Sequence, residues 1–263
     1  MPENRKHTLF ILRLINVFGI PLGILVYSLA LSLALATHIT QDRQAVPYIS
    51  TLSINAPMIY FFAFGSFMQS FVAIVVVWAY RLSVLDPILD ARPALKPWNH
   101  AAVASAVFAS VCLGIMGIAP VDSDYYDSFA GSAARHEPSI SQTINEISFL
   151  LLGVSSNVYF ALDFALMLYF PAIRTKRVAA RVSLYVVKLL LAPPACFVVW
   201  AAVGDHWYAK FTVSALAEWV DFYLAWACIV LLAFDMGTEN PNRLNNVEMD
   251  VLYNGRAQAA NAA

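Results

Sequence analysis

Six long apolar runs alternate with polar segments along the chain. Each run reaches the length of about 17–25 residues or more that a transmembrane helix needs. Continuous runs predict helices rather than the alternating ten-residue segments of a membrane β-barrel, because a helix pairs its backbone N–H groups within its own segment. We therefore expect an all-α bundle of six transmembrane helices, at about residues 8–37, 58–80, 101–119, 143–170, 182–203 and 212–236.

The first run, the fifth run and the C-terminal segment each indicate a further structural feature. The first run follows a basic start, as a signal peptide would, but it is about twice as long as the 7–15-residue apolar region of a signal peptide, so we expect an uncleaved helix. Pro193 and Pro194 should kink the fifth helix, because proline removes a backbone donor and clashes with the preceding turn. Residues 1–236 then form one transmembrane domain, and the polar segment 237–263 is expected to be a disordered tail.

The basic residues outside the runs predict the orientation in the membrane. Cytoplasmic segments of membrane proteins carry an excess of lysine and arginine. With the N-terminus inside, the opposite side holds only three basic residues, Arg43, Arg135 and Lys210. The cytoplasmic side then holds twelve: Arg5, Lys6, Arg13, Arg81, Arg92, Lys96, Arg174, Lys176, Arg177, Arg181, Arg243 and Arg256. We therefore expect both termini in the cytoplasm.

Composition supports a membrane protein and excludes several other classes. Only 13% of the residues are charged and the mean hydropathy is +0.65, whereas soluble domains contain about 25% charged residues. A net charge of −1 excludes a broadly basic nucleic-acid-binding protein. The three cysteines lie inside apolar runs without metal-ligand spacing, and the usual motifs of soluble enzymes are missing. We predict no catalytic residue, no metal site and no cofactor.

Charged residues inside the predicted helices are the first candidates for function. Each costs roughly 2.5–3.5 kcal/mol at the centre of a transmembrane helix on insertion scales. Asp163 in the fourth run and Lys188 in the fifth lie at similar depth from the cytoplasmic ends of consecutive helices. We expect these two side chains to form an intramembrane ion pair. A structural pair, a lysine that extends alone to the headgroups, and a role in transport or catalysis all fit this pattern.

Two carboxylates in the sixth run form a second candidate. Glu218 and Asp221 are three residues apart and so lie on one face of a helix, towards its outer end. Neighbouring carboxylates raise each other's pKa and can share a proton, as in ion relays. Alternatively, they accept hydrogen bonds from neighbouring helices or face a wet outer cavity.

Two short segments, together with the layout of six runs, resemble a known family. One segment is Pro47-Tyr48-Ile49-Ser50, with Pro57 before the second run, and the other is Ser214 to Trp219, with Phe234-Asp235 at the inner end of the sixth run. Leu113 to Ile118 is also similar to that family's third helix. The resemblance is to the DRAM (damage-regulated autophagy modulator) family, which is related to GPI-anchor lipid-remodelling proteins and to membrane adaptors of phosphoinositide kinase.

The two family-like segments fall at the same outer face of the predicted bundle. A carboxylate inside a helix is costly unless donors reach it, and a loop folded back over the bundle can supply them. We therefore expect Glu218 to accept hydrogen bonds from Tyr48, Ser50 or Thr51, in an outer-face cluster that also contains Trp219 and Asp221. The alternative is Glu218 open to a water-filled vestibule.

Three alternative functions follow, of which the resemblance implies the first two and the intramembrane charges Asp163, Lys188, Glu218 and Asp221 motivate the third. The first is a non-enzymatic membrane modulator or adaptor in autophagy, membrane lipid organisation or phosphoinositide signalling. The second is a factor in GPI-anchor lipid remodelling, and the third is a small transporter or channel that uses the intramembrane carboxylates. The expected partners are membrane lipids and a membrane or cytoplasmic protein, and the expected location is the plasma membrane or an endolysosomal or Golgi membrane.

Overall fold

The computed structural model describes residues 3–37, 47–49, 52, 57–85, 89, 93–121, 139–169, 178–204 and 206–237. All regular elements within these ranges are helical. The main helices are α1 (Glu3–Ala36), α2 (Met58–Tyr80), α4 (Lys96–Ile118), α6 (Ile140–Tyr169), α7 (Val178–Val186), α8 (Ala192–Ala202) and α9 (Trp207–Gly237). Three short helical turns join or extend them: η2 (Arg81–Leu85), η3 (Pro93–Leu95) and η5 (Val187–Leu191). The expected all-α class is confirmed for this part of the chain.

Four of the described helical segments are long and apolar enough to cross a membrane: Met58–Tyr80, Pro93–Ile118, Ile140–Leu168 and Tyr208–Leu232. A fifth crossing results if the bent pair Ala179–Leu190 and Pro194–Ala202 acts as one span. The described apolar part of α1, Pro21–Ala36, is shorter. Six spans therefore stay a prediction, and the expected tail 237–263 lies, after Gly237, outside the described residues.

The fifth predicted helix is bent where the sequence places its two prolines. The axes on either side of the break make an angle of 42°. The π-helical turn η5 lies directly before the prolines of α8, because a residue without an N–H interrupts the normal i to i−4 ladder. Lys188 belongs to this turn, so a charged side chain lies at the bend of the helix.

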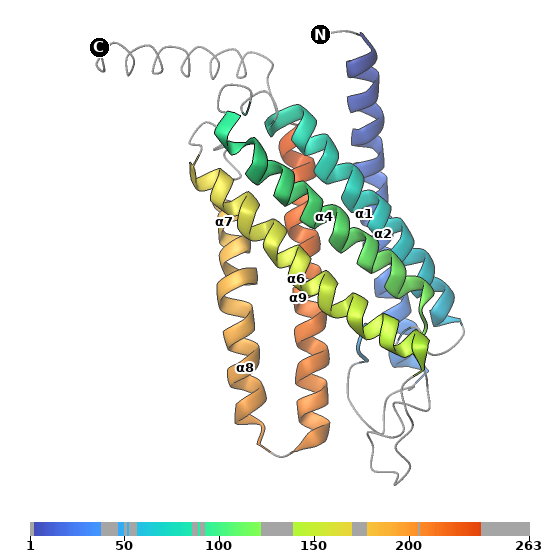
Figure 1. Cartoon of the computed structure of the whole chain (residues 1–263). Helices are drawn as coiled ribbons and strands as arrows, with labels where there is room; N and C mark the ends of the chain where they lie inside the picture. Colours follow the sequence, from blue (N-terminus) through green and yellow to red (C-terminus); the bar gives the residue numbers. More distant parts are fainter. Residues whose placement is uncertain are drawn as a thin grey trace.

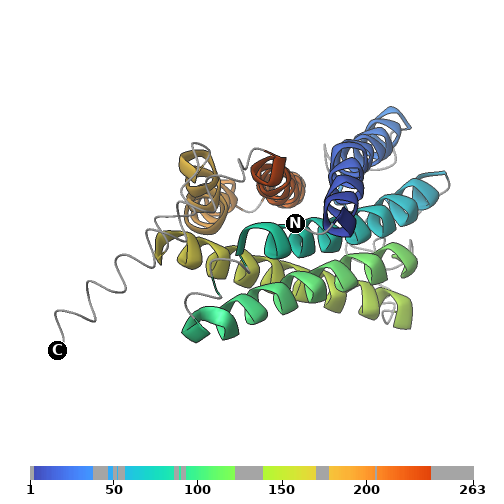
Figure 2. The ribbon, with the colours of Figure 1, turned by 90° about the horizontal axis from the view of Figure 1, so that it is seen from above.

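The helices pack in two groups that meet at α9. Helices α1, α2, α4 and α6 lie side by side in chain order, tilted in Figure 1 and layered in Figure 2. Helix α9 packs against α1 and α2, and the α7–η5–α8 arm packs against α9. The largest core joins α2, α4, α6, α7 and α9, whereas many large apolar side chains, such as Phe67 and Leu150, face outwards as a lipid-facing surface requires.

Close approach of α2 to its neighbours depends on small residues. A Cβ atom added to Gly117 on α4 would lie 2.7 Å from Ser66 Cβ and 3.2 Å from the Ala63 carbonyl oxygen on α2. Gly23 on α1 is similarly covered by the side chain of Gln69. Such contacts allow backbones to approach closely where lipid gives no hydrophobic drive to helix association.

Candidate functional site

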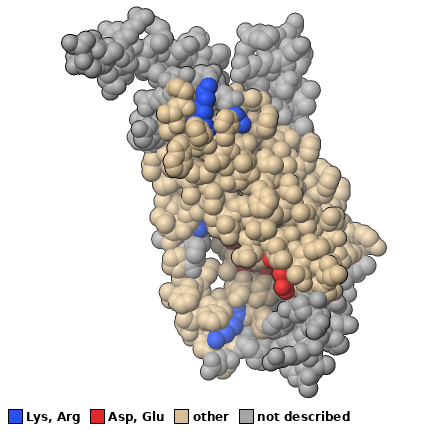
Figure 3. Space-filling model, viewed as in Figure 1, with Lys and Arg blue, Asp and Glu red and all other residues tan. Residues whose placement is uncertain are grey.

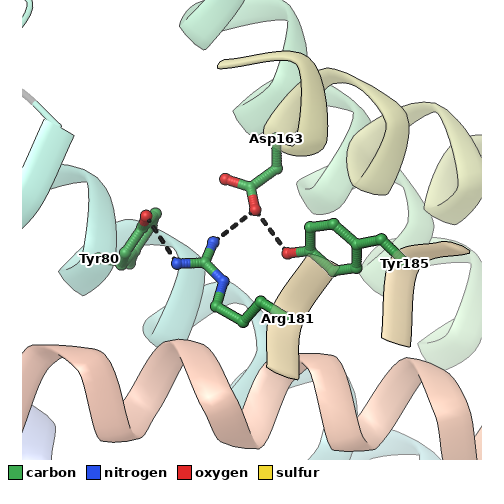
Figure 4. A network of polar contacts seen from close by, with 4 residues as sticks. All are labelled: Tyr80, Asp163, Arg181 and Tyr185. Atoms are coloured by element: carbon green, nitrogen blue, oxygen red, sulfur yellow. Dashed lines mark hydrogen bonds and ion pairs between the residues drawn. The ribbon is translucent and has the colours of Figure 1, made fainter. Parts of the chain in front are cut away.

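A buried polar feature of the bundle is an ion pair between Asp163 and Arg181 (Figure 4). Arg181 Nη2 lies 2.6 Å from Asp163 Oδ2, and both side chains are almost fully buried. Asp163 is on α6, and Arg181 is in the first turn of α7. A buried pair of this kind is held only if further hydrogen bonds satisfy the remaining polar atoms.

Two tyrosines provide those additional contacts. Arg181 Nη1 donates to the Tyr80 hydroxyl at 3.0 Å, and the Tyr185 hydroxyl donates to the same oxygen of Asp163 that Arg181 binds. The guanidinium carbon also lies 5.0 Å from the centre of the Tyr80 ring. The network therefore ties the end of α2 to α6 and α7 in the interior of the protein.

A second ion pair connects the bent arm to α9. Lys188 Nζ on η5 lies 2.5 Å from Asp221 Oδ1. The side chain of Lys188 is fully buried, whereas 46% of the Asp221 side chain is exposed. Lys188 also lies 5.5 Å from the ring centre of Phe160 on α6, so the ammonium sits between α6 and α9.

The predicted Asp163–Lys188 ion pair is wrong in its partners. Asp163 binds Arg181 and Lys188 binds Asp221. The sequence-based estimate started the fifth helix at Val182 and counted Arg181 as a cytoplasmic anchor. Because α7 begins at Val178, Arg181 lies within the helix and is buried. A guanidinium at that position reaches Asp163, which leaves Lys188, about two turns further along, for the carboxylate of α9.

The described loop residues 47–49 before α2, called the outer loop below, contact α9. The backbone N–H of Ile49 donates to Glu218 Oε2 at 3.2 Å, and Trp219 Nε1 donates to the carbonyl oxygen of Pro47 at 2.8 Å. Ile49, a donor among the described residues, lies in the sequence between the expected donors Tyr48 and Ser50. Ser50 and Thr51 lie outside the described residues. Pro47 and Ile49 are buried, so the described part of the loop packs onto the bundle.

Tyr48 is held against the start of α9. Its ring meets that of Phe211 edge to face at 6.3 Å, and its hydroxyl is hydrogen-bonded with Ser214. Burial raises the pKa of the Tyr48 phenol, the Ser214 contact lowers it in part, and the nearby Glu218 carboxylate raises it further. Tyr48 therefore stays protonated at neutral pH.

A cavity of about 180 Å³ lies between α2, α4, α6 and α9. Its walls are mostly apolar and include Val77, Leu113, Phe149 and Trp226. Glu218 and Asp221 also line it, and Ile49 from the outer loop closes one part of its wall. In Figure 3 this face is mostly uncharged, with a few acidic atoms in its lower half. The two carboxylates of the outer-face cluster therefore border an apolar space rather than a polar vestibule.

Sequence reasoning missed several residues around these groups. Arg181 and Tyr185 were missed. Together with Lys188, which the sequence analysis names, they recur at spacings of four and three on one face of a helix, and this pattern is readable once α7 is started earlier. Tyr80 could not be found this way, because it comes from a distant helix. Among the described residues, no three histidine, cysteine or acidic side chains are grouped closely enough to hold a metal ion.

Comparison with known protein families gives a match over most of the chain. The family model described as "Frag1/DRAM/Sfk1/Cwh43P N-terminal domain" matches residues 10–239. No curated protein and no solved structure matches the chain. The match covers nearly the whole of the helical region, including both ion pairs, the cavity and the outer loop. Together with its apolar helices, this makes the chain an integral, multi-pass membrane protein that belongs to the Frag1/DRAM/Sfk1/Cwh43P N-terminal domain family.

Proposed function

We propose that this protein is a non-enzymatic membrane modulator that binds lipid and influences membrane lipid organisation. The observation that carries the proposal is the apolar cavity between α2, α4, α6 and α9. Ligand sites are mostly apolar concave spaces with a small number of polar groups, and this cavity has that composition inside a membrane protein. The ligand available to such a space is membrane lipid.

The charged residues support a structural role better than a chemical one. Asp163, Lys188 and Asp221 are each engaged in an ion pair, and Glu218 accepts a backbone hydrogen bond. Groups held in this way fix the positions of α6, α7 and α9 around the cavity. The protein would then act by presenting a fixed surface to lipid or to a protein partner. The processes it would serve are autophagy, lipid organisation or phosphoinositide signalling. Its location would be the plasma membrane or an endolysosomal or Golgi membrane.

Loss of the protein tests this proposal. In cells that lack it, we expect the chemical species of the membrane lipids to be unchanged, while the distribution of lipids between the leaflets shifts, measured with impermeant headgroup-reactive probes. The parent chain should restore the distribution, and a Gly153→Phe variant should not. Gly153 lines the cavity and has open space around it, so a phenyl ring can fill the cavity without a backbone clash.

A matched control separates cavity filling from a general effect of an added ring. Leu150 lies one turn earlier on α6 and is 65% exposed on the outside, so Leu150→Phe should restore the distribution like the parent chain. Altered acyl chains on GPI anchors would instead favour the remodelling alternative. Unchanged lipid species together with an unchanged leaflet distribution would contradict the proposal.

Transport is the second candidate. Arg181 and Lys188 lie on one helix face, and their ion pairs with Asp163 and with Asp221 on α9 form a series of charged groups inside the protein. Ion flux into proteoliposomes containing the whole chain tests it. A flux that Asp221→Asn abolishes would favour transport over lipid binding.

A further inference from the structure

The Lys188–Asp221 pair has an unequal environment that points to a ligand. The lysine side chain is fully buried, but the aspartate side chain is 46% exposed and lines the cavity. Asp221 is 14 residues after the start of α9 and 16 before its end, or about 21 Å and 24 Å along the helix. A partly exposed carboxylate halfway along a membrane helix faces hydrocarbon unless a hydrogen-bond donor covers it.

The size and lining of the cavity restrict that donor to part of a larger apolar molecule. An apolar cavity of about 150 Å³ stays dry and takes up benzene, so about 180 Å³ suits a ring or one stretch of hydrocarbon chain. A whole lipid with two chains does not fit. One chain would occupy the cavity while the remainder of the lipid stays in the bilayer.

Charge restricts the headgroup. The carboxylates of Glu218 and Asp221 line the cavity, whereas the Lys188 ammonium is buried behind Asp221. A phosphate beside these carboxylates would be repelled and would lose its hydration at this depth. A hydroxyl carries no charge and can donate to Asp221.

We propose that the cavity binds a neutral lipid with a hydroxyl headgroup, its hydrocarbon between α4, α6 and α9 and its hydroxyl donating to Asp221. This inference rests on the proposed function, because it names the class of lipid for the same cavity. Two sources of this chemistry are a diacylglycerol and a sterol, which share the hydroxyl and differ in the shape of the hydrocarbon.

Photolabelling of the whole chain in phosphatidylcholine vesicles tests the headgroup. The probes are diacylglycerol and phosphatidylcholine with the same diazirine-bearing acyl chain, so that they differ only in the hydroxyl and the phosphocholine. Because a hydrogen bond to a charged group is strong, we expect about tenfold more labelling by the diacylglycerol probe, on peptides of α4, α6 or α9. Competition by unlabelled diacylglycerol and by unlabelled sterol then identifies the source.

Variants separate the headgroup from the cavity. Lys188→Met with Asp221→Leu removes both charges together, leaves no buried charge alone, and should abolish the preference for diacylglycerol. Gly153→Phe should remove labelling by both probes, and Leu150→Phe should leave it unchanged. Thermal unfolding of each variant shows that it is folded.

The outcomes distinguish this inference from the proposed function. Equal labelling by both probes, lost in Gly153→Phe, would overturn the hydroxyl preference and leave a lipid-binding cavity. A preference that survives removal of both charges would also overturn it. Labelling confined to other helices and insensitive to Gly153→Phe would overturn both proposals.

Discussion

Lys188 and Asp221 form an ion pair in which the cation is fully buried and the anion is half exposed. The two residues lie on separate helical elements, η5 and α9, so the pair fastens the bent arm to the rest of the bundle. Its asymmetry makes the consequences of losing either partner different. A hydrogen-bond donor from outside the protein can still reach a surviving Asp221, whereas a surviving Lys188 is enclosed in protein, so the second survivor costs more.

Asp221→Ala should therefore destabilise the protein more than Lys188→Ala. The first leaves a fully buried ammonium without its carboxylate, with an expected loss of about 3–5 kcal/mol, and the second leaves a half-exposed carboxylate. The double variant Lys188→Met/Asp221→Leu should be more stable than Asp221→Ala alone. Denaturant unfolding in detergent measures all three, and a double variant less stable than either single one would contradict the pairing.

Two neighbouring tyrosines should respond in opposite ways to loss of the hydroxyl. Tyr185 donates to Asp163, so Tyr185→Phe should cost about 1.5–3 kcal/mol, the range for a hydrogen bond to a charged group. The Tyr159 hydroxyl is buried without a hydrogen-bond partner among the described residues, so Tyr159→Phe should be neutral or slightly stabilising. Both variants keep the ring, which makes each the control for the other. Equal destabilisation in unfolding experiments would refute this assignment.

Glycines on α4 and α6 provide a test of helix packing. Gly117→Leu places a side chain against the backbone of α2 and should destabilise by about 1–3 kcal/mol through overpacking. Gly153→Leu meets open space and should be tolerated, since both substitutions gain similarly in helix propensity. Thermal unfolding of the two variants compares them directly. A larger loss for Gly153→Leu would mean that α6 packs differently.

The orientation can be tested independently of the contacts. The excess of basic residues predicts that both termini are cytoplasmic, with an even number of spans. Single cysteines introduced at Ser128 and Thr238, in a background without the native three, should react with an impermeant reagent from opposite sides of sealed vesicles. Reaction from the same side would mean an even number of spans between the two positions and would contradict the six-span arrangement.

The sequence was sufficient for the all-helical class and for the positions of Asp163, Lys188, Glu218 and Asp221 inside helices, because long apolar runs and the cost of charge in hydrocarbon are local properties. It was insufficient for the partners of Asp163 and Lys188. Partner choice depends on where a helix starts and how it tilts. The predicted start of the fifth helix is four residues too late, which places Arg181 in the loop, whereas in the structure it is buried inside α7.

The cavity illustrates a second limit. Its wall combines residues from four helices and the outer loop, so no single sequence motif marks it. The contact of Glu218 with the outer loop was accessible from the sequence, because the need of a carboxylate for donors and the shared membrane face both follow from the helix pattern. The described donor, the backbone N–H of Ile49, leaves no signal in residue type.

That backbone contact supports a last prediction about the outer face. The Ile49 N–H donates to Glu218, and the Pro47 carbonyl accepts from Trp219. The loop is therefore attached to two adjacent residues of α9. Glu218→Ala removes the acceptor and should raise the hydrogen-exchange rate of the Ile49 amide by about tenfold or more, in proportion to a charge-assisted hydrogen bond. Glu218→Gln keeps an acceptor oxygen and should retain part of the protection.

Trp219→Phe supplies the matching test from the second attachment point. It keeps an aromatic ring but removes the donor to the Pro47 carbonyl, so Ile49 exchange should rise although its own hydrogen bond is intact. Trp98→Phe is the control, since Trp98 is 57% exposed on α4 and away from the loop. Ile49 exchange that rises equally in Trp98→Phe would indicate general loosening of the bundle. Exchange unaffected by Glu218→Ala would mean that the loop is held to the bundle by other contacts, and that Glu218 serves the cavity rather than the loop.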